Sequence, residues 1–257
     1  MIEIIELTKS YNSFLALDKL TLNVSANSIF GFVGPNGAGK STTLNILTGI
    51  ISPNSGSIKI LNMDFRKDSL EIKRNIGVIP EVLALFDGLT GEEHLTFAGK
   101  VYGVEKNVLE GRVKELLDFF DLIPAKDRLI ETYSQGMRKK AAFAAAIIHS
   151  PKVLFLDEPF ENVDPVMRKK MKEILVRMKN NGVAVMITSH ALIEVEDFCD
   201  EVAIIKKGKL VYQSKTADIR KKIKDEVSKE NYSSLEEIFL DVIKSPGNEE
   251  EKKLSWL

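Results

Sequence analysis

The sequence predicts an α/β fold with a mostly parallel sheet, an N-terminal antiparallel β subdomain and an inserted α-helical subdomain. Apolar runs of strand length recur along the chain and are separated by helix-length segments. The first part of the chain instead alternates apolar and polar residues, and residues 90–149 contain no strand-like run. The chain has 257 residues, 44% of them apolar, so it can bury one large core in one or two domains.

The N-terminal residues predict a small antiparallel sheet. Ile2 to Leu7 alternates apolar and polar residues, and Leu15 to Val24 sets apolar residues between polar ones. Such alternation is typical of strands with one buried face. The first strand starts directly after Met1, with no basic start and no apolar segment of signal-peptide length, so we expect a chain that is not exported.

Continuous apolar runs predict the parallel sheet. Ile29 to Val33 is followed by glycines and a helical pattern, which is typical of a buried strand that leads into a helix. Similar runs occur at Ile76 to Ile79, Val153 to Leu156, Val183 to Thr188 and Glu201 to Ile205. Residues 206–209 indicate a hairpin turn between two short strands at the end of this region.

The remaining segments are predicted to be helical. One helix face carries Leu109, Val113, Leu116, Leu117 and Phe120. We expect residues 1–215 to form one domain with a helical subdomain inserted at about 88–150. Residues 216–257 should form a helical extension with a charged tail, in which Ser233 and Ser234 precede the last helix.

Composition excludes several classes of protein. The 36 basic residues are balanced by 37 acidic ones, so the chain lacks the positive field that nucleic-acid binding needs. The single cysteine, Cys199, can form no internal disulfide, fits a reducing cytosol and is expected to be buried. The longest apolar stretch, Ala141 to Ile148, is far shorter than the roughly 20 residues that cross a bilayer. If the protein serves a membrane, another chain spans it.

A glycine-rich segment predicts a phosphate-binding loop. It reads Gly34, Pro35, Asn36, Gly37, Ala38, Gly39, Lys40, Ser41 and Thr42, which satisfies G-x-x-x-x-G-K-[ST] between a strand and a helix. Its backbone N–H groups and the helix N-terminus would bind the phosphates of ATP. Lys40 would reach the β and γ phosphates, and Ser41 would bind Mg²⁺. The alternative is a glycine-rich turn with a chance lysine.

Two carboxylates end a later apolar strand. Asp157 and Glu158 follow Val153 to Leu156, and the ends of parallel strands face the ligand crevice. Asp157 can hold the Mg²⁺ shell, while Glu158 can orient and deprotonate the attacking water. Alternatively, the two acids only cap the next helix.

With these motifs in place, the chain resembles the ABC transporter ATPases, a group of P-loop NTPases. The family signature Leu-Ser-Gly-Gly-Gln here reads Tyr133, Ser134, Gln135, Gly136 and Met137, about twenty residues before Asp157. The resemblance implies that Ser134 contacts a γ-phosphate bound by a second subunit and that Gly136 permits close approach. Read by itself, Ser134 is a helix cap.

Other family elements map onto single residues. Asp164, in Phe160 to Pro165, matches the D-loop acid that couples two active sites, or it caps the helix that begins at Pro165. His190 follows an apolar strand and matches the histidine that contacts the γ-phosphate. Tyr11 matches the aromatic residue that stacks on adenine, with ordinary sheet packing as the alternative.

One position departs from the family pattern. Glu81 stands where the family usually has glutamine. About 5 Å from a phosphate charge, its carboxylate would be repelled by roughly 3 kcal/mol at an effective dielectric near 20. We therefore hypothesise that Glu81 binds Mg²⁺ directly or through water. The alternative is a solvated loop acid.

The resemblance implies an ATP-binding and ATP-hydrolysing subunit that uses ATP and Mg²⁺, with Lys40, Glu158 and His190 as catalytic residues. It further implies a homodimer, or a heterodimer with a related ATPase, on the cytoplasmic face of the cell membrane, bound to integral-membrane permease subunits. The nearest group is the ABC-2 group, which implies outward transport. The transported substrate would be set by the permease.

Two alternatives remain open. One is a soluble ABC ATPase in an assembly process such as iron–sulfur cluster scaffolding. The other is a regulatory module that binds nucleotide without hydrolysing it, against which Asp157, Glu158 and His190 argue. The chain has one phosphate loop and no long heptad run, so tandem-cassette translation factors and chromosome-maintenance ATPases are disfavoured.

Overall fold

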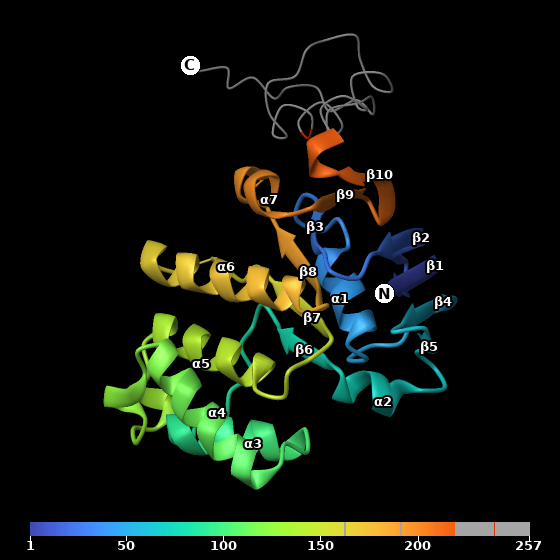
Figure 1. Ribbon diagram of the computed structural model, residues 1–257. Helices are drawn as coiled ribbons and strands as arrows, with labels where there is room; N and C mark the ends of the chain where they lie inside the picture. Colours follow the sequence, from blue (N-terminus) through green and yellow to red (C-terminus); the bar gives the residue numbers. More distant parts are fainter. Residues whose placement is uncertain (162, 191, 219–238, 240–257) are drawn as a thin grey trace, which may run out of the picture.

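The computed structural model describes residues 1–161, 163–190, 192–218 and 239, which build two sheets with helices packed around them (Figure 1). The smaller sheet is antiparallel, with strand order β2-β1-β4-β5. Its strands are β1 (Ile2–Tyr11), β2 (Phe14–Val24), β4 (Ser55–Ile60) and β5 (Met63–Asp64). The predicted N-terminal antiparallel sheet is confirmed for β1 and β2.

Strands β4 and β5 were not predicted. Strand β4 begins Ser-Gly-Ser and buries only Ile58 and Ile60, so its apolar alternation is too short to stand out in the sequence. It is a strand because β1 offers a paired edge, with Ile2 opposite Ile60 and Ile4 opposite Ile58.

The larger sheet has strand order β10-β9-β3-β8-β7-β6. Its strands are β3 (Ile29–Val33), β6 (Ile76–Ile79), β7 (Val153–Asp157), β8 (Ala184–Ser189), β9 (Glu201–Lys206) and β10 (Lys209–Lys215). All neighbours pair in parallel except β10, which pairs antiparallel with β9 across the predicted turn. The predicted parallel core is therefore confirmed, with β3 and β8 at its centre.

Seven α-helices occur in the described part of the chain. They are α1 (Lys40–Leu47), α2 (Ser69–Arg74), α3 (Gly91–Val101), α4 (Lys106–Phe119), α5 (Gln135–Ile147), α6 (Pro165–Asn180) and α7 (Leu192–Phe198). Two 3₁₀ turns, η1 (Ile123–Ala125) and η2 (Ile130–Thr132), connect α4 to α5. Thr90 and Glu93 form a capping box that starts α3. The predicted apolar face of α4 is buried at Leu109, Val113 and Leu117.

The core lies on both faces of the large sheet. Phe30, Phe32 and Phe155 face α1 and the antiparallel sheet, whereas Leu154 and Leu156, on alternate positions of β7, face α4, α5 and α6. Burying each of these side chains contributes about 1.5–3 kcal/mol. Helices α1 and α5 consequently cover opposite faces of one sheet, as Figure 1 also shows.

Three further expectations concern burial, membrane spans and the C-terminus. Cys199 is buried as predicted, and burial raises the pKa of its thiol to about 12. None of the helices in the described ranges combines the length and apolar character needed to cross a bilayer. The predicted last helix after Ser233 and the charged tail lie outside the described residues, except for Phe239, which packs on the helical side of the core.

Candidate nucleotide site

The predicted phosphate loop joins the end of β3 to the start of α1, at the centre of the large sheet. Gly39 caps α1 in the left-handed conformation, with φ of +111°. A Cβ atom there would lie 2.8 Å from the carbonyl oxygen of Ala16, so this position requires glycine. Gly37 also has a positive φ, of +76°, but nothing lies within 4 Å of its missing Cβ. The loop is therefore packed on one side and open on the other.

Lys40 is buried inside this loop, with only 7% of the residue exposed. Its Nζ donates to the carbonyl oxygens of Gly34 at 2.7 Å and Pro35 at 3.3 Å. Burial lowers the pKa of Lys40, and the nearby carboxylates of Glu158, Asp157 and Glu81 oppose that shift. The chain thus places one buried ammonium within electrostatic reach of three carboxylates from the ends of β6 and β7.

Asp157 is the buried end of β7 and lies in register with Thr188 of β8. The Thr188 hydroxyl donates to Asp157 Oδ1 and accepts the backbone N–H of Glu158, with an N to O distance of 3.2 Å. This one hydroxyl therefore contacts both acidic residues. Sequence reasoning missed Thr188, because its position opposite Asp157 depends on the register of two strands far apart in the chain.

Glu158 has an unusual backbone conformation for a residue with a side chain. Its φ is +46°, in the left-handed region. Its Oε1 lies 3.1 Å from Nδ1 of His190, and the side chains are 14% and 60% exposed, respectively. The structure therefore brings together the residues predicted as general base and as γ-phosphate contact.

A lysine that sequence reasoning did not identify also contacts this region. Nζ of Lys139, in α5, donates to the backbone carbonyl oxygens of Glu158 at 2.7 Å and Glu161 at 2.8 Å. Nothing in the local sequence distinguishes Lys139 from the adjacent Lys140, and only the packing of α5 against the loop after β7 reveals the contact.

The residues predicted to act across a dimer lie at helix starts. Ser134 caps α5 by accepting the N–H of Met137 at 3.3 Å, and Asp164 caps α6 by accepting the N–H of Met167 at 2.9 Å. Both capping interpretations are thus confirmed. Gln135 and Ser134 are exposed, and nothing lies within 4 Å of the missing Cβ of Gly136. The start of α5 presents an open surface.

Tyr11 lies at the end of β1, opposite Phe14 of β2, and is 44% exposed. Nζ of Lys9 lies 5.2 Å from the centre of the Tyr11 ring, on one of its faces. An exposed ring covered on one face by a cation can still stack with a base on its other face.

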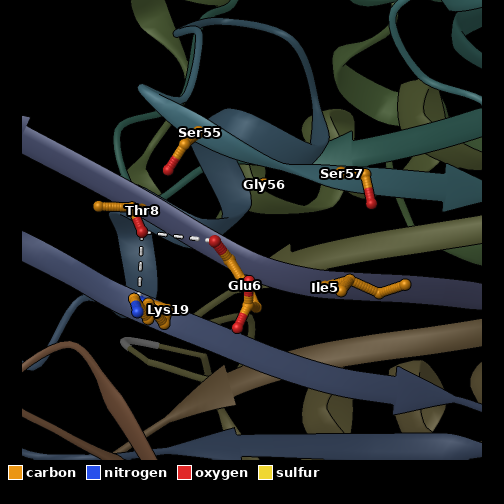
Figure 2. Close-up of a pocket in the computed structure, with 7 residues that line it drawn as sticks. All are labelled: Ile5, Glu6, Thr8, Lys19, Ser55, Gly56 and Ser57. Carbon is orange, nitrogen blue, oxygen red and sulfur yellow. Dashed lines mark hydrogen bonds between the residues drawn. The ribbon is translucent and has the colours of Figure 1, made fainter.

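A shallow pocket of about 250 Å³ lies elsewhere, on the antiparallel sheet (Figure 2). Residues of β1, β2 and β4 line it, at the point where Glu6 and Lys19 have positive φ and the strand register shifts. The Thr8 hydroxyl donates to the Glu6 carbonyl and accepts the Lys19 N–H, as Figure 2 shows. Strand bulges explain this hollow, which includes none of the predicted site residues.

The geometry also suits a magnesium ion that arrives with a nucleotide. Within the residues that the structure describes, no cluster of three or more His, Cys, Asp or Glu side chains could hold a metal ion by itself. Mg²⁺ is usually bound through one or two carboxylates together with substrate phosphates, so Asp157 and the Ser41 hydroxyl fit this ion.

Comparisons with known proteins agree with this geometry. Residues 17–161 match the family described as ABC transporter. The chain is 36% identical to the daunorubicin/doxorubicin resistance ATP-binding protein DrrA of Streptomyces peucetius, over 85% of this chain and 66% of that protein. It is 33% identical to the linearmycin resistance ATP-binding protein LnrL of Bacillus subtilis, over 95% and 79%. It is 38% identical to the bacitracin transport ATP-binding protein BcrA of Bacillus licheniformis, over 82% and 68%.

Solved structures show the same fold. A solved structure of the ATP-binding subunit of an ABC transporter has a TM-score of 0.88 and 28% identity, and the match covers 95% of this chain and all of that one. The dimeric structure of the bacterial ABC transporter cassette MJ0796 has a TM-score of 0.78 and 25% identity, over 84% and 99%. The chain therefore belongs to the ABC transporter family, as one of its ATP-binding and ATP-hydrolysing subunits.

Proposed function

We propose that this subunit energises an exporter-type transporter by closing, as a homodimer or with a related ATPase, around ATP and Mg²⁺. The phosphate loop of one subunit would hold the nucleotide, and residues 134–137 of the other would cover its γ-phosphate. The observation that carries the proposal is the cluster of buried Lys40, Asp157 and the Glu158–His190 pair at the ends of the central strands. The open start of α5 supports the second subunit's part.

The proposed hydrolysis uses the chain's own groups in defined roles. Glu158 accepts a proton from water, whose oxygen forms a bond to the γ-phosphorus while the bond to the ADP oxygen breaks. His190 orients the Glu158 carboxylate and contacts the γ-phosphate, and Lys40 balances phosphate charge. Gly34 to Thr42 would bind the phosphates and Tyr11 the adenine. Mg²⁺, held by Ser41 and Asp157, would neutralise charge on the β and γ phosphates.

Glu81 is proposed as a further contact to Mg²⁺. It is exposed, yet close enough to Lys40 to influence the pKa of that lysine. Glu81→Gln should raise the Mg²⁺ concentration that gives half-maximal turnover. Unaltered magnesium dependence and turnover would assign Glu81 to solvent instead.

The membrane partner would dock next to Glu81. Between β6 and α3 and along α3 the chain exposes large apolar side chains, namely Val82, Phe86, Phe97 and Val101. Two of these side chains, Phe86 and Phe97, are in contact, with 4.8 Å between ring centroids, and such exposed apolar side chains support a permease contact, which would place the subunit on the cytoplasmic face of the membrane. The relatives DrrA and LnrL are named as resistance proteins and BcrA as a transport protein, which supports outward transport.

We propose domain boundaries that separate the nucleotide site, the permease contact and the C-terminal extension. Residues 1–215 would form the ATPase domain, and helices within about 88–150 would form the subdomain that carries residues 134–137 and the permease contact. Residues 216–257 would form a separate extension. Co-purification with an integral-membrane protein from solubilised membranes tests the permease, and its failure would favour the soluble assembly ATPase.

The nucleotide mechanism is tested by Glu158→Gln. Turnover of ATP should fall by roughly 10²–10⁴, because the amide cannot accept the proton, while ATP-induced dimers persist in light scattering. Glu161→Gln is the matched control, because it makes the same change at an exposed acid three residues further along and should leave turnover near normal. Unchanged turnover in Glu158→Gln would remove Glu158 from the role of base.

A further inference from the structure

Lys139 of helix α5 forms hydrogen bonds to the loop that follows β7, residues 158–164, which we call the catalytic loop. Lys139 lies five residues after Ser134, about 7.5 Å along the helix axis. Its partly buried ammonium donates to two backbone carbonyl oxygens, those of Glu158 at 2.7 Å and Glu161 at 2.8 Å. Burial lowers the pKa of Lys139, and the carboxylates of Glu161, Glu158 and Asp157 oppose that shift. The two hydrogen bonds replace the water that the ammonium loses on burial, so breaking them would be costly.

These hydrogen bonds matter because the backbone of Glu158 is strained. A left-handed backbone costs a residue with a side chain about 1–2 kcal/mol and persists only where the surroundings hold it. Two side chains hold the Glu158 backbone, one on each side of its Cα, and the Glu161 N–H also donates to the Glu158 carbonyl oxygen at 3.3 Å. The Thr188 hydroxyl accepts the N–H, and Lys139 donates to the C=O. Together they direct the side chain toward His190.

A second cation binds two further carbonyl groups of the loop. Nη2 of Arg168, in α6, donates to the carbonyl oxygens of Phe160 and Val163, each at 3.4 Å. Residues 158–163 contain no glycine, and cationic side chains from two helices bind their carbonyl groups. Lys139 is bound to the carbonyl oxygen of Glu158 itself.

We propose that Lys139 is a positioning residue for ATP hydrolysis, which fixes the backbone of Glu158 so that its carboxylate stays where it can accept the proton of water. The proposal rests on the role of Glu158 as base under the proposed function. It also makes α5 a link between two sites. The helix that presents Ser134 to a partner's nucleotide holds the base of its own subunit, so a shift of α5 would change the position of Glu158.

The experiment compares lysine variants in steady-state ATP hydrolysis. Lys139→Met keeps the apolar stem and removes the ammonium. We expect kcat to fall about 10- to 100-fold, with the KM for ATP changed less than about twofold, because the phosphate loop is intact. Lys139→Arg, which can donate to both carbonyls, should restore most of kcat. Lys140→Met removes the same charge from the next residue of α5 and should leave kcat near the wild-type value.

A merely structural role would give a different pattern. It would lower the melting temperature and raise KM together with the loss of kcat, and such a result would overturn the proposal. A kcat of Lys139→Met within twofold of wild type would also overturn it. If Lys139→Met fails to fold, Lys139→Gln replaces it, because glutamine keeps one donor group without the charge. Its kcat should be intermediate, and a wild-type kcat would overturn the proposal.

Glu158→Gln in the same assay separates the two proposals. If Glu158→Gln is inactive and Lys139→Met is active, the positioning role fails while the general base stands. If Glu158→Gln retains full turnover, the base assignment fails, and the positioning role fails with it.

Discussion

Two loops leave the ends of β3 and β7, with β8 between these strands, and both lead to the start of a helix. Residues 34–39 contain three glycines, whereas residues 158–164 contain none. Gly39 adopts a positive φ without a side chain to strain, but Glu158 adopts one with a carboxylate that the chemistry needs. The first loop makes its positive-φ turns with its own glycines, whereas the second has no glycine and is held by contacts supplied by α5, α6 and β8.

The difference shows where each loop is vulnerable. The phosphate loop should fail through changes at its own residues, because Gly34 and Gly39 lie so close to β9 and β2 that neither has room for a Cβ atom. The catalytic loop should fail through changes elsewhere in the chain, because Lys139 and Thr188 hold it from α5 and β8. Function can thus be lost at residues that touch neither nucleotide nor water.

The largest expected effect compares two glycines of the phosphate loop. Both Gly37 and Gly39 have positive φ, but a Cβ at Gly39 would lie 2.7 Å from Leu17 Cδ2 and 2.8 Å from Ala16 O, and one at Gly37 would lie in open space. Gly39→Ala should cost about 3 kcal/mol or more of unfolding free energy and abolish ATP binding, against about 1 kcal/mol of unfolding free energy for Gly37→Ala. Urea unfolding and nucleotide titration measure both. Equal costs would contradict the view that packing shapes this loop.

A smaller effect is expected at Thr188. Thr188→Val leaves the Asp157 carboxylate and the Glu158 N–H without their shared partner, at a cost of about 1–3 kcal/mol. Turnover should fall by about tenfold or more, while Thr188→Ser, which keeps the hydroxyl, should remain close to wild type. If valine and serine give the same turnover, support of the catalytic loop from β8 is not needed.

The smallest effect concerns His149, at the opposite end of the sheet from both loops. Its ring stacks on Tyr102 with 3.6 Å between centroids, and Nε2 donates to the Ile76 carbonyl at 3.0 Å. Burial lowers the pKa of His149 to about 4 in the folded chain, against an ordinary value of 6.5. The unfolded chain therefore binds more protons between these values, so stability is retained above pH 6.5 and lost as pH falls toward 4.

We expect lowering the pH from 7 to 5 to cost about 1–2 kcal/mol of unfolding free energy through His149, which urea unfolding would detect as a steeper pH dependence than in His149→Gln. Site geometry should be unaffected, so the KM for ATP of the two proteins should vary alike over this range. Identical pH dependence of unfolding would show that His149 titrates normally.

The contrast between the loops also explains what the sequence could predict. The phosphate loop, Asp157, and the caps Ser134 and Asp164 were identified because each depends on neighbours within a few residues. Strand β4 was missed because Ser55, Gly56 and Ser57 hide its alternation, and it forms only where β1 provides an edge. Thr188 and Lys139 were missed as supports because register and helix packing, which no local pattern encodes, bring them to Asp157 and Glu158.

The most direct test of a nucleotide held between two copies is complementation between inactive variants. Lys40→Ala removes the phosphate contact, and Ser134→Arg blocks the open start of α5, so each alone should be inactive. In an equal mixture, half of the dimers would contain one intact site formed by the unmodified phosphate loop and the unmodified α5. We therefore expect about a quarter of wild-type turnover per subunit.

Mixing Lys40→Ala with Glu158→Gln provides the control, because Lys40 and Glu158 belong to the same subunit's half of the site and no intact site can form. That mixture should stay inactive. If the Lys40→Ala and Ser134→Arg mixture hydrolyses no more ATP than its two components measured separately, the shared site proposed for this subunit is contradicted.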